Sequence, residues 1–143
     1  MAPNASPEIE LADRLHSAAI HMLRRVARED AKSGLGAPAL SALSVIVFGG
    51  PISLGRLAEA ERVRPPTMTR TVQALEAAGL VRREADPGDG RVVRLRATAP
   101  GTRVLHAARA RRVDALASSL RSLPEQDLQT LELAVDVLDR IST

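Results

Sequence analysis

The chain has 143 residues, about the length of one domain, and its 45% hydrophobic and 26% charged residues are typical of a folded globular protein. It contains no cysteine, which excludes disulfides, thiolate metal sites and thiol redox sensing. Its only aromatic residue is Phe48. One ring nearly rules out a platform on which single-stranded bases stack.

Positive charge is concentrated in the middle of the chain. Residues 1–55 hold five basic and five acidic side chains, residues 56–112 hold 13 arginines and six acids, and residues 113–143 hold two arginines and six acids. A concentrated basic segment favours a polyanionic partner such as nucleic acid. An arginine-rich surface that meets only solvent explains the charge equally well, so charge alone does not decide between them.

The first part of the chain predicts three helices. Apolar residues recur at steps of three and four from Glu8 to about Glu29, which predicts a long amphipathic helix ending before the glycines of residues 33–36. A second helix is predicted from Pro38 to Phe48, before Gly49-Gly50-Pro51. A third is predicted from a Ser53 cap to about Glu61.

The basic segment predicts a helix followed by a hairpin. Pro65 and Pro66 open a fourth helix that runs to Ala78. Strands are predicted from Leu80 to Ala85 and from Val92 to Thr98, joined by the turn-forming sequence DPGDGR of residues 86–91. A helix, a tight turn, a second helix and a hairpin make a winged helix-turn-helix. The fold class is therefore mainly α with a small β-hairpin wing.

Two more helices are predicted near the C-terminus, from Pro100 to about Ser122 and from Pro124 onward. The first and sixth helices carry more apolar surface than a lone winged helix can cover, so this surface must be buried against something. Either a second copy of the chain covers it, or the two helices form an intramolecular core.

The fourth helix has one apolar face and one polar face. At 100° per residue, its apolar residues fall on one side, which predicts a core face of Met68, Val72 and Leu75. Arg70 and Gln73 point the opposite way, with Thr67 and Thr69 toward the flanks. Arginine bonds guanine bidentately and glutamine bonds adenine in the same manner, so this face suits a major groove. An ordinary surface helix with two polar residues is the alternative.

Residues 53–101 resemble the MarR family of bacterial transcription regulators. The motifs that carry the resemblance are Leu57-Ala58, Leu75 with Gly79-Leu80-Val81, the wing sequence Asp86-Pro87-Gly88-Asp89-Gly90-Arg91, and Thr98 with Gly101. The order of the flanking helices also fits, so the resemblance covers nearly the whole chain. Four positions depart from the family pattern: Arg62 for a glycine, Arg64 for a capping serine, Gly90 for a basic residue and Ala97 for a leucine.

The resemblance implies one domain over residues 1–143, with a DNA-binding lobe at about 38–98 and dimerisation helices at about 8–31 and 100–141. It implies a homodimer that binds double-stranded DNA at a palindromic operator, as a repressor more readily than an activator. It also implies release by a small apolar or aromatic effector held between the lobe and the dimerisation helices. The sequence does not identify the effector, although Arg14, His16 and His21 are candidates for that crevice.

Site roles follow from the same comparison and from the chemistry of the side chains. We expect base contacts from Arg70, Gln73 and Thr67, and phosphate contacts from Thr69, Arg56 and Arg64. We expect Arg91 to enter the minor groove. Three further residues are expected to stiffen the wing rather than touch DNA: Asp86, Asp89 and Arg94.

Signatures of enzymes and of metal or cofactor sites are missing from the sequence. His16 and His21 lie five residues apart on one helix, too far around it to chelate one metal, and no phosphate loop, G-x-S-x-G or H-E-x-x-H occurs. We expect neither catalysis nor a metal or cofactor, and a cytoplasmic location because the N-terminus lacks a signal sequence. The rival functions are a nonspecific architectural DNA-binding protein and a helical interaction protein without DNA binding.

Overall fold

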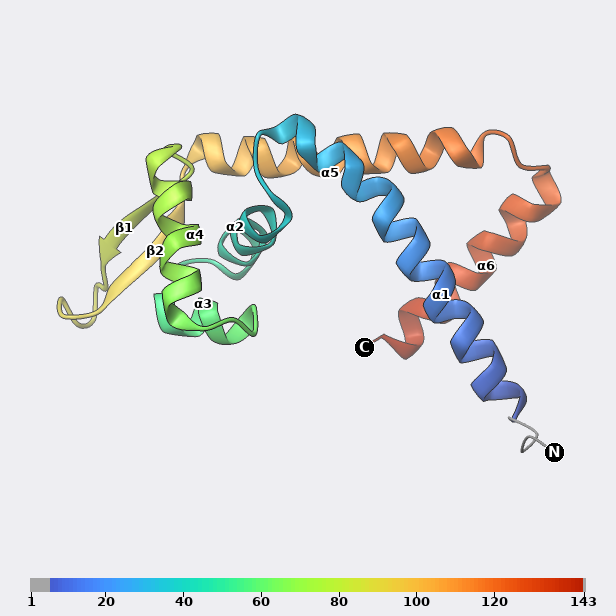
Figure 1. The fold of residues 1–143 in the computed structure, drawn as a ribbon, viewed down its shortest axis with the longest axis horizontal. Helices are drawn as coiled ribbons and strands as arrows, with labels where there is room; N and C mark the ends of the chain where they lie inside the picture. Colours follow the sequence, from blue (N-terminus) through green and yellow to red (C-terminus); the bar gives the residue numbers. More distant parts are fainter. Residues whose placement is uncertain (1–5, 143) are drawn as a thin grey trace.

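A computed structural model describes residues 6–142 as a mainly helical chain with one antiparallel hairpin, so the expected fold class is confirmed (Figure 1). The elements in chain order are α1 (Pro7–Ala27), the 3₁₀ helix η1 (Arg28–Ser33), α2 (Ala37–Gly49), α3 (Leu54–Ala60), α4 (Pro65–Ala77), β1 (Val81–Ala85), β2 (Val93–Ala97), α5 (Ala99–Leu120) and α6 (Glu125–Ile141).

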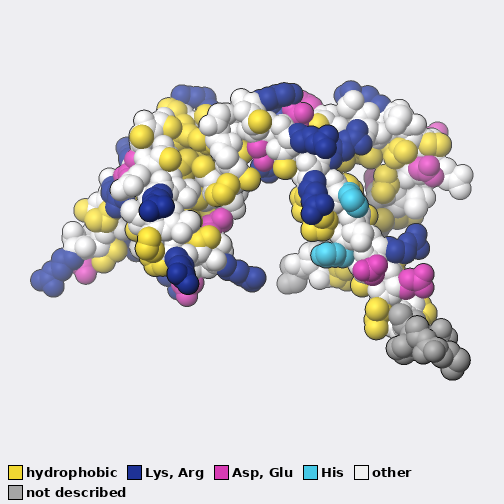
Figure 2. Space-filling model, in the orientation of Figure 1, with side chains coloured by type: hydrophobic (Ala, Val, Ile, Leu, Met, Phe, Trp, Pro, Cys, Tyr) yellow, Lys and Arg dark blue, Asp and Glu magenta, His cyan; other side chains and the backbone are white. Residues whose placement is uncertain are grey.

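The long helix α5 connects two parts of the molecule (Figure 1). Helices α2, α3 and α4 and the hairpin gather around its beginning, and we call this part the lobe. Helices α1 and α6 lie toward its other end, where both chain termini are found. In the space-filling view the molecule forms an arch that is open between the lobe and these two helices (Figure 2).

The main buried core lies inside the lobe. Its members come from α2, α3, α4, the hairpin region and the start of α5: Ala42, Leu43, Ile46, Leu57, Ala58, Met68, Val72, Leu75, Leu80, Val81, Leu95 and Leu105. The predicted core face of α4 is confirmed, because its three apolar residues are each at most 2% exposed. The opposite face of that helix is therefore left to solvent.

Both helices of the helix-turn-helix end in a left-handed residue. Gly79 ends α4 with φ of 70°, and the Leu80 N–H donates to the Leu75 carbonyl over 2.9 Å. Arg62 ends α3 with φ of 54°, which a residue with a Cβ adopts at a steric penalty. The Val63 N–H closes that turn on the Ala58 carbonyl over 3.0 Å. The left-handed backbone at Arg62 thus favours glycine, which is the residue that the family pattern has at this position.

The root of the wing is fixed against α4 and α5. The Thr98 hydroxyl donates to the Gly79 carbonyl over 2.6 Å and accepts from the Gly101 N–H over 3.1 Å. A Cβ on Gly101 would lie 2.1 Å from the Leu80 carbonyl oxygen, so only glycine fits this contact. Ile52 forms an isolated antiparallel bridge with Leu95 of β2, and the two residues exchange N–H···O bonds of 3.1 and 2.7 Å.

Helices α1 and α6 bury none of their own described residues. Many of their apolar side chains are exposed: Ile9, Leu11, Leu15, Met22, Leu23, Leu128, Leu131, Leu133, Val135, Val137 and Ile141. The alternative of an intramolecular core between them is therefore wrong.

Among the described residues no single helix is long and apolar enough to cross a membrane. The segments Pro7–Ser33 and Ala37–Gly49 together have the length and composition of a membrane span, but the chain bends by 86° between them.

Several predicted boundaries differ from the structure by one or two residues. The first helix stops at Ala27 instead of Glu29, because the chain tightens there into η1. The strands begin at Val81 and Val93, one residue later than predicted, and the second ends at Ala97. The Thr98 N–H still donates to the Leu80 carbonyl over 3.0 Å, but the Leu80 N–H closes the end of α4 on Leu75 and Thr98 is the N-cap of α5, so neither residue belongs to a strand.

Candidate nucleic-acid interface

The outward face of α4 carries the two residues expected to read bases. Arg70 and Gln73 are both exposed, and they lie on the side of the helix opposite Val72 and the core. Exposed small residues share this face: Pro66, Ala74 and Ala77. Small neighbours let a helix approach the floor of a groove closely, so the long arginine and glutamine side chains can reach base edges.

Two of the three threonines of α4, Thr67 and Thr69, differ in their availability. The Thr69 hydroxyl donates to the Pro65 carbonyl over 2.9 Å and is partly buried. A hydroxyl has a single proton, so Thr69 must rotate before it can donate to a phosphate. Thr67 is exposed at the first turn and is better placed for a contact. The N-terminus of α4 also lacks two backbone donors, because Pro65 and Pro66 have no N–H.

Arginines flank α4 on the side of the turn. Ser53 caps α3 by accepting from the Arg56 N–H over 3.3 Å. The Arg56 guanidinium lies 3.3 Å from the Glu59 carboxylate, with both side chains at least 70% exposed, so this ion pair is weak and leaves the guanidinium accessible. Arg62 and Arg64 are exposed on the turn itself. This edge of the lobe is positive and open to solvent.

Carboxylates order the tip of the wing. Asp86 accepts from the Gly88 N–H over 2.7 Å and from the Asp89 N–H over 3.1 Å, and it pairs with Arg94. These bonds, led by that of Gly88, hold the pKa of Asp86 below its ordinary value. Asp89 accepts from the Arg91 N–H over 3.0 Å. The structure thus brings the three residues expected to stiffen the wing together around Arg91, whose side chain is exposed.

A second set of ion pairs runs along the strands. The Glu84 carboxylate contacts Arg82 at 2.5 Å and Arg96 at 2.6 Å, and the hydrogen bond from Arg96 is the main cause that lowers the pKa of Glu84. Arg83 bonds Glu76 of α4 over 2.9 Å. Arg82 and Arg96 are opposite one another in the ladder, so Glu84 relieves their repulsion.

These pairs distinguish the arginines of the strands from those of the turn, α4 and the wing tip. The strand arginines neutralise carboxylates inside the lobe. Within the described part of the chain, no carboxylate oxygen lies within 4.0 Å of four others: Arg62, Arg64, Arg70 and Arg91. Sequence reasoning expected the pairing of Arg94 with a wing carboxylate but missed the pairs of Glu84, although the alternation of Arg82 and Glu84 opposite Arg94 and Arg96 was a usable signal.

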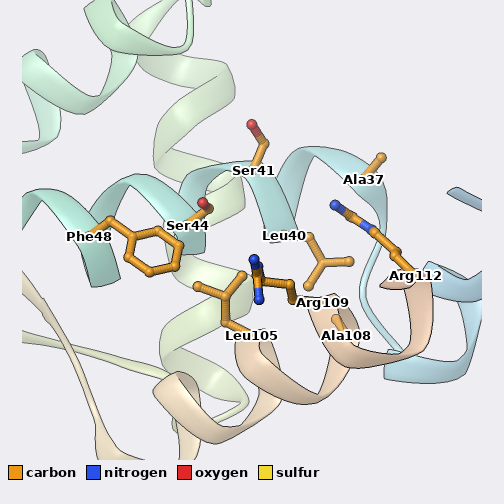
Figure 3. A pocket seen from close by; sticks show the side chains of 9 residues that line it. All are labelled: Ala37, Leu40, Ser41, Ser44, Phe48, Leu105, Ala108, Arg109 and Arg112. Carbon is orange, nitrogen blue, oxygen red and sulfur yellow. The ribbon is translucent and has the colours of Figure 1, made fainter. Parts of the chain in front are cut away.

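A cleft of about 460 Å³ lies between α2 and α5 (Figure 3). Its lining combines apolar walls with two serines and two arginines: Ala37, Leu40, Ser41, Ser44, Phe48, Leu105, Ala108, Arg109 and Arg112. The ring of Phe48 meets His106 edge to face, with centroids 6.1 Å apart. Sequence reasoning did not find these residues. The three candidates it offered for an effector crevice, Arg14, His16 and His21, are not among the lining residues.

Sequence and structure comparisons agree on the family. The MarR family model matches residues 37–93. HTH-type transcriptional regulators of Mycobacterium leprae and Mycobacterium tuberculosis are each 34% identical to this chain over 131 residues, which is 92% of either length. A MarR family protein from Bacillus stearothermophilus has a similar structure, with a TM-score of 0.79 and 25% identity over 99% of both chains.

A transcriptional regulator protein from Pseudomonas aeruginosa is also similar, with a TM-score of 0.81 and 28% identity over 97% of this chain and 98% of its own. These likenesses extend over the helices on both sides of the lobe. Membership of one family of DNA-binding proteins accounts for the winged helix-turn-helix, the exposed face of α4 and the ordered wing tip. The chain belongs to the MarR family of helix-turn-helix transcriptional regulators, which are DNA-binding proteins.

Proposed function

We propose that the protein is a sequence-specific repressor that binds a palindromic operator as a homodimer and is released by a small anionic effector. The observation that carries the proposal is the exposed face of α4, where Arg70 and Gln73 are open to solvent beside small residues. The ordered wing tip supports it, because Arg91 is held at the end of a stiff hairpin.

The proposed contacts divide into two kinds. Arg70 and Gln73, with Thr67, read base edges in the major groove, and Arg91 enters the adjacent minor groove, where negative potential attracts arginine. Phosphate contacts come from three residues around the turn: Arg56, Arg64 and Thr69. These fix the register of the lobe on the duplex and carry no sequence information of their own.

The apolar side chains on α1 and α6 support the homodimer. Exposed apolar surface of this extent is typical of protein interfaces, and the six exposed apolar residues on α6 are 38–70% exposed. We assign residues of about 8–31 and 100–141 to dimerisation and residues of about 38–98 to DNA binding. A two-fold dimer places its recognition helices in successive major grooves. The protein then acts where bacterial DNA lies, in the cytoplasm.

The cleft between α2 and α5 supports the effector. Arg109 and Arg112 supply positive charge, Ser41 and Ser44 supply hydroxyls, and the remaining lining is largely apolar (Figure 3). This combination suits a small organic anion with an apolar or aromatic body. The cleft also lies where the lobe joins α5, so an occupant could change how the lobe is held.

The test begins by selecting, from genomic fragments, the duplexes that the purified protein retains. Affinity for a selected duplex and for a scrambled duplex is then measured at several salt concentrations. A repressor of this kind prefers its operator by roughly 10³-fold or more throughout. An architectural protein loses affinity steeply with salt on both duplexes and shows no such preference. Retention of no duplex by an intact dimer would favour an interaction protein.

A further inference from the structure

Asp30 is the one buried charged residue in the described part of the chain, with 5% of its surface exposed. It lies on η1, the segment that joins α1 to α2. Arg112 of α5 binds both of its oxygens, with Nε to Oδ1 at 2.5 Å and Nη2 to Oδ2 at 2.7 Å. The pair therefore fastens η1 to the middle of α5, at the place where the chain passes from α1 into the lobe.

Arg112 also faces the cleft between α2 and α5. Its side chain is 41% exposed and lines the same cleft as Arg109 and Ser41 (Figure 3). A guanidinium has five N–H donors, and Asp30 engages two of its nitrogens. Arg109 has no carboxylate within 4.0 Å among the described residues. The cleft thus presents two guanidinium groups, of which one has an internal counter-ion.

We propose that Asp30 competes with an anionic effector for Arg112. This inference rests on the proposed function of the cleft. An anion bound between Arg109 and Arg112 meets the like charge of Asp30 just behind Arg112, and the two anions raise each other's free energy at this short range. The bound anion draws Arg112 toward the cleft, and the bidentate contact to Asp30 is lost.

Loss of that contact releases η1 from α5. In the free protein Arg112 binds Asp30, and in the bound protein it binds the effector. The effector therefore makes a contact in one state that it cannot make in the other, which allows it to shift the populations of the two states. Because η1 connects α1 to α2, its release changes how the lobe is held relative to the dimerisation helices. Asp30 therefore sets both the affinity of the cleft for anions and the resting geometry of the lobe.

The competition is tested with Asp30→Asn, which keeps the size of the side chain and removes its charge. Benzoate is the probe, and its binding to the full-length protein is measured by calorimetry. We expect the variant to bind benzoate about tenfold or more tightly than the wild type, since a like charge close to the site is gone. Glu29→Gln is the matched control, because Glu29 carries the same charge on η1 but pairs with Lys32. Its benzoate affinity should equal that of the wild type.

Hydrogen exchange gives a second readout that needs no ligand. We expect the amides of residues 28–33 to exchange faster in Asp30→Asn than in the wild type, and equally fast in the benzoate-saturated wild type. If the wild type binds benzoate and Asp30→Asn binds it equally or more weakly, Asp30 is not a competitor and the inference is overturned. If neither protein binds benzoate, the cleft is not an organic-anion site, and the proposed effector fails together with the competition.

Discussion

Substitution of Gly101 by alanine tests how α5 positions the wing. The added Cβ would lie 2.1 Å from the Leu80 carbonyl oxygen and 2.9 Å from its carbon, both of which are backbone atoms that no side-chain rotation can move. The start of α5 and the end of α4 must therefore separate by about 1 Å to restore ordinary contact. Such a shift also strains the Thr98 bonds to the Leu80 and Gly79 carbonyls, which measure 3.0 and 2.6 Å.

The expected loss of stability can be worked from these contacts. Overpacking of this kind costs about 1–3 kcal/mol, and two weakened hydrogen bonds cost about 1 kcal/mol each. Alanine recovers about 1 kcal/mol of helix propensity over glycine. The free energy of unfolding should fall by about 2–4 kcal/mol, which moves the urea midpoint down by roughly 1–2 M.

Urea unfolding followed by circular dichroism measures this loss, at one fixed protein concentration because the stability of the proposed dimer would depend on concentration. Gly55→Ala is the matched control, since nothing lies within 4 Å of the Cβ it adds on the exposed face of α3. Its stability should stay the same or rise slightly. Equal stability of Gly101→Ala and the wild type would refute the close approach of the two helices.

Three further predictions concern the turn, the wing and the dimer. Arg62→Gly should raise the free energy of unfolding by about 0.5–1 kcal/mol by relieving φ of 54°, whereas Arg62→Ala, which keeps the Cβ, should not. The pKa values of Glu84 and Asp86 are lowered from their ordinary values of 4.5 and 3.8. Their ion pairs therefore stabilise the wing fully above about pH 4.5. This stabilisation is lost as the pH falls through the lowered pKa values of the folded protein. Wing amides should then exchange faster at acid pH, and Glu84→Gln should flatten this dependence. Leu131→Glu should weaken dimerisation by roughly 100-fold or more in sedimentation, whereas Gln129→Glu, on the opposite, polar face of α6, should not.

Local sequence patterns predicted the lobe well. The core face of α4 follows from the 3.6-residue period, and the hairpin follows from alternation around a turn sequence, so both depend on residues close together in the chain. Gly101 was identifiable only through the family pattern, because its close approach to Leu80 depends on how α5 packs. The wing carboxylates were predictable for the same local reason as the hairpin.

The rest of the candidate site depends on contacts between distant residues. Asp30 and Arg112 are 82 positions apart, and no periodicity relates η1 to the middle of α5. The bridge between Ile52 and Leu95 likewise joins the wing to a segment that reads as a loop. The cleft draws on α2 and α5, whose apolar residues the sequence assigned only to packing. The ion pair, the bridge and the cleft all depend on tertiary packing, which local sequence patterns do not reveal.

The central claim is that α4 reads bases, and Arg70→Lys tests it most directly. Lysine keeps the positive charge but lacks the planar fork that bonds guanine bidentately. Affinity of the protein for its selected operator and for a scrambled duplex is measured by fluorescence anisotropy, with Arg121→Lys at the exposed end of α5 as the control. We predict a loss of about 5- to 150-fold on the operator, with the scrambled duplex and the control variant unchanged. Unchanged operator preference in Arg70→Lys would contradict the account.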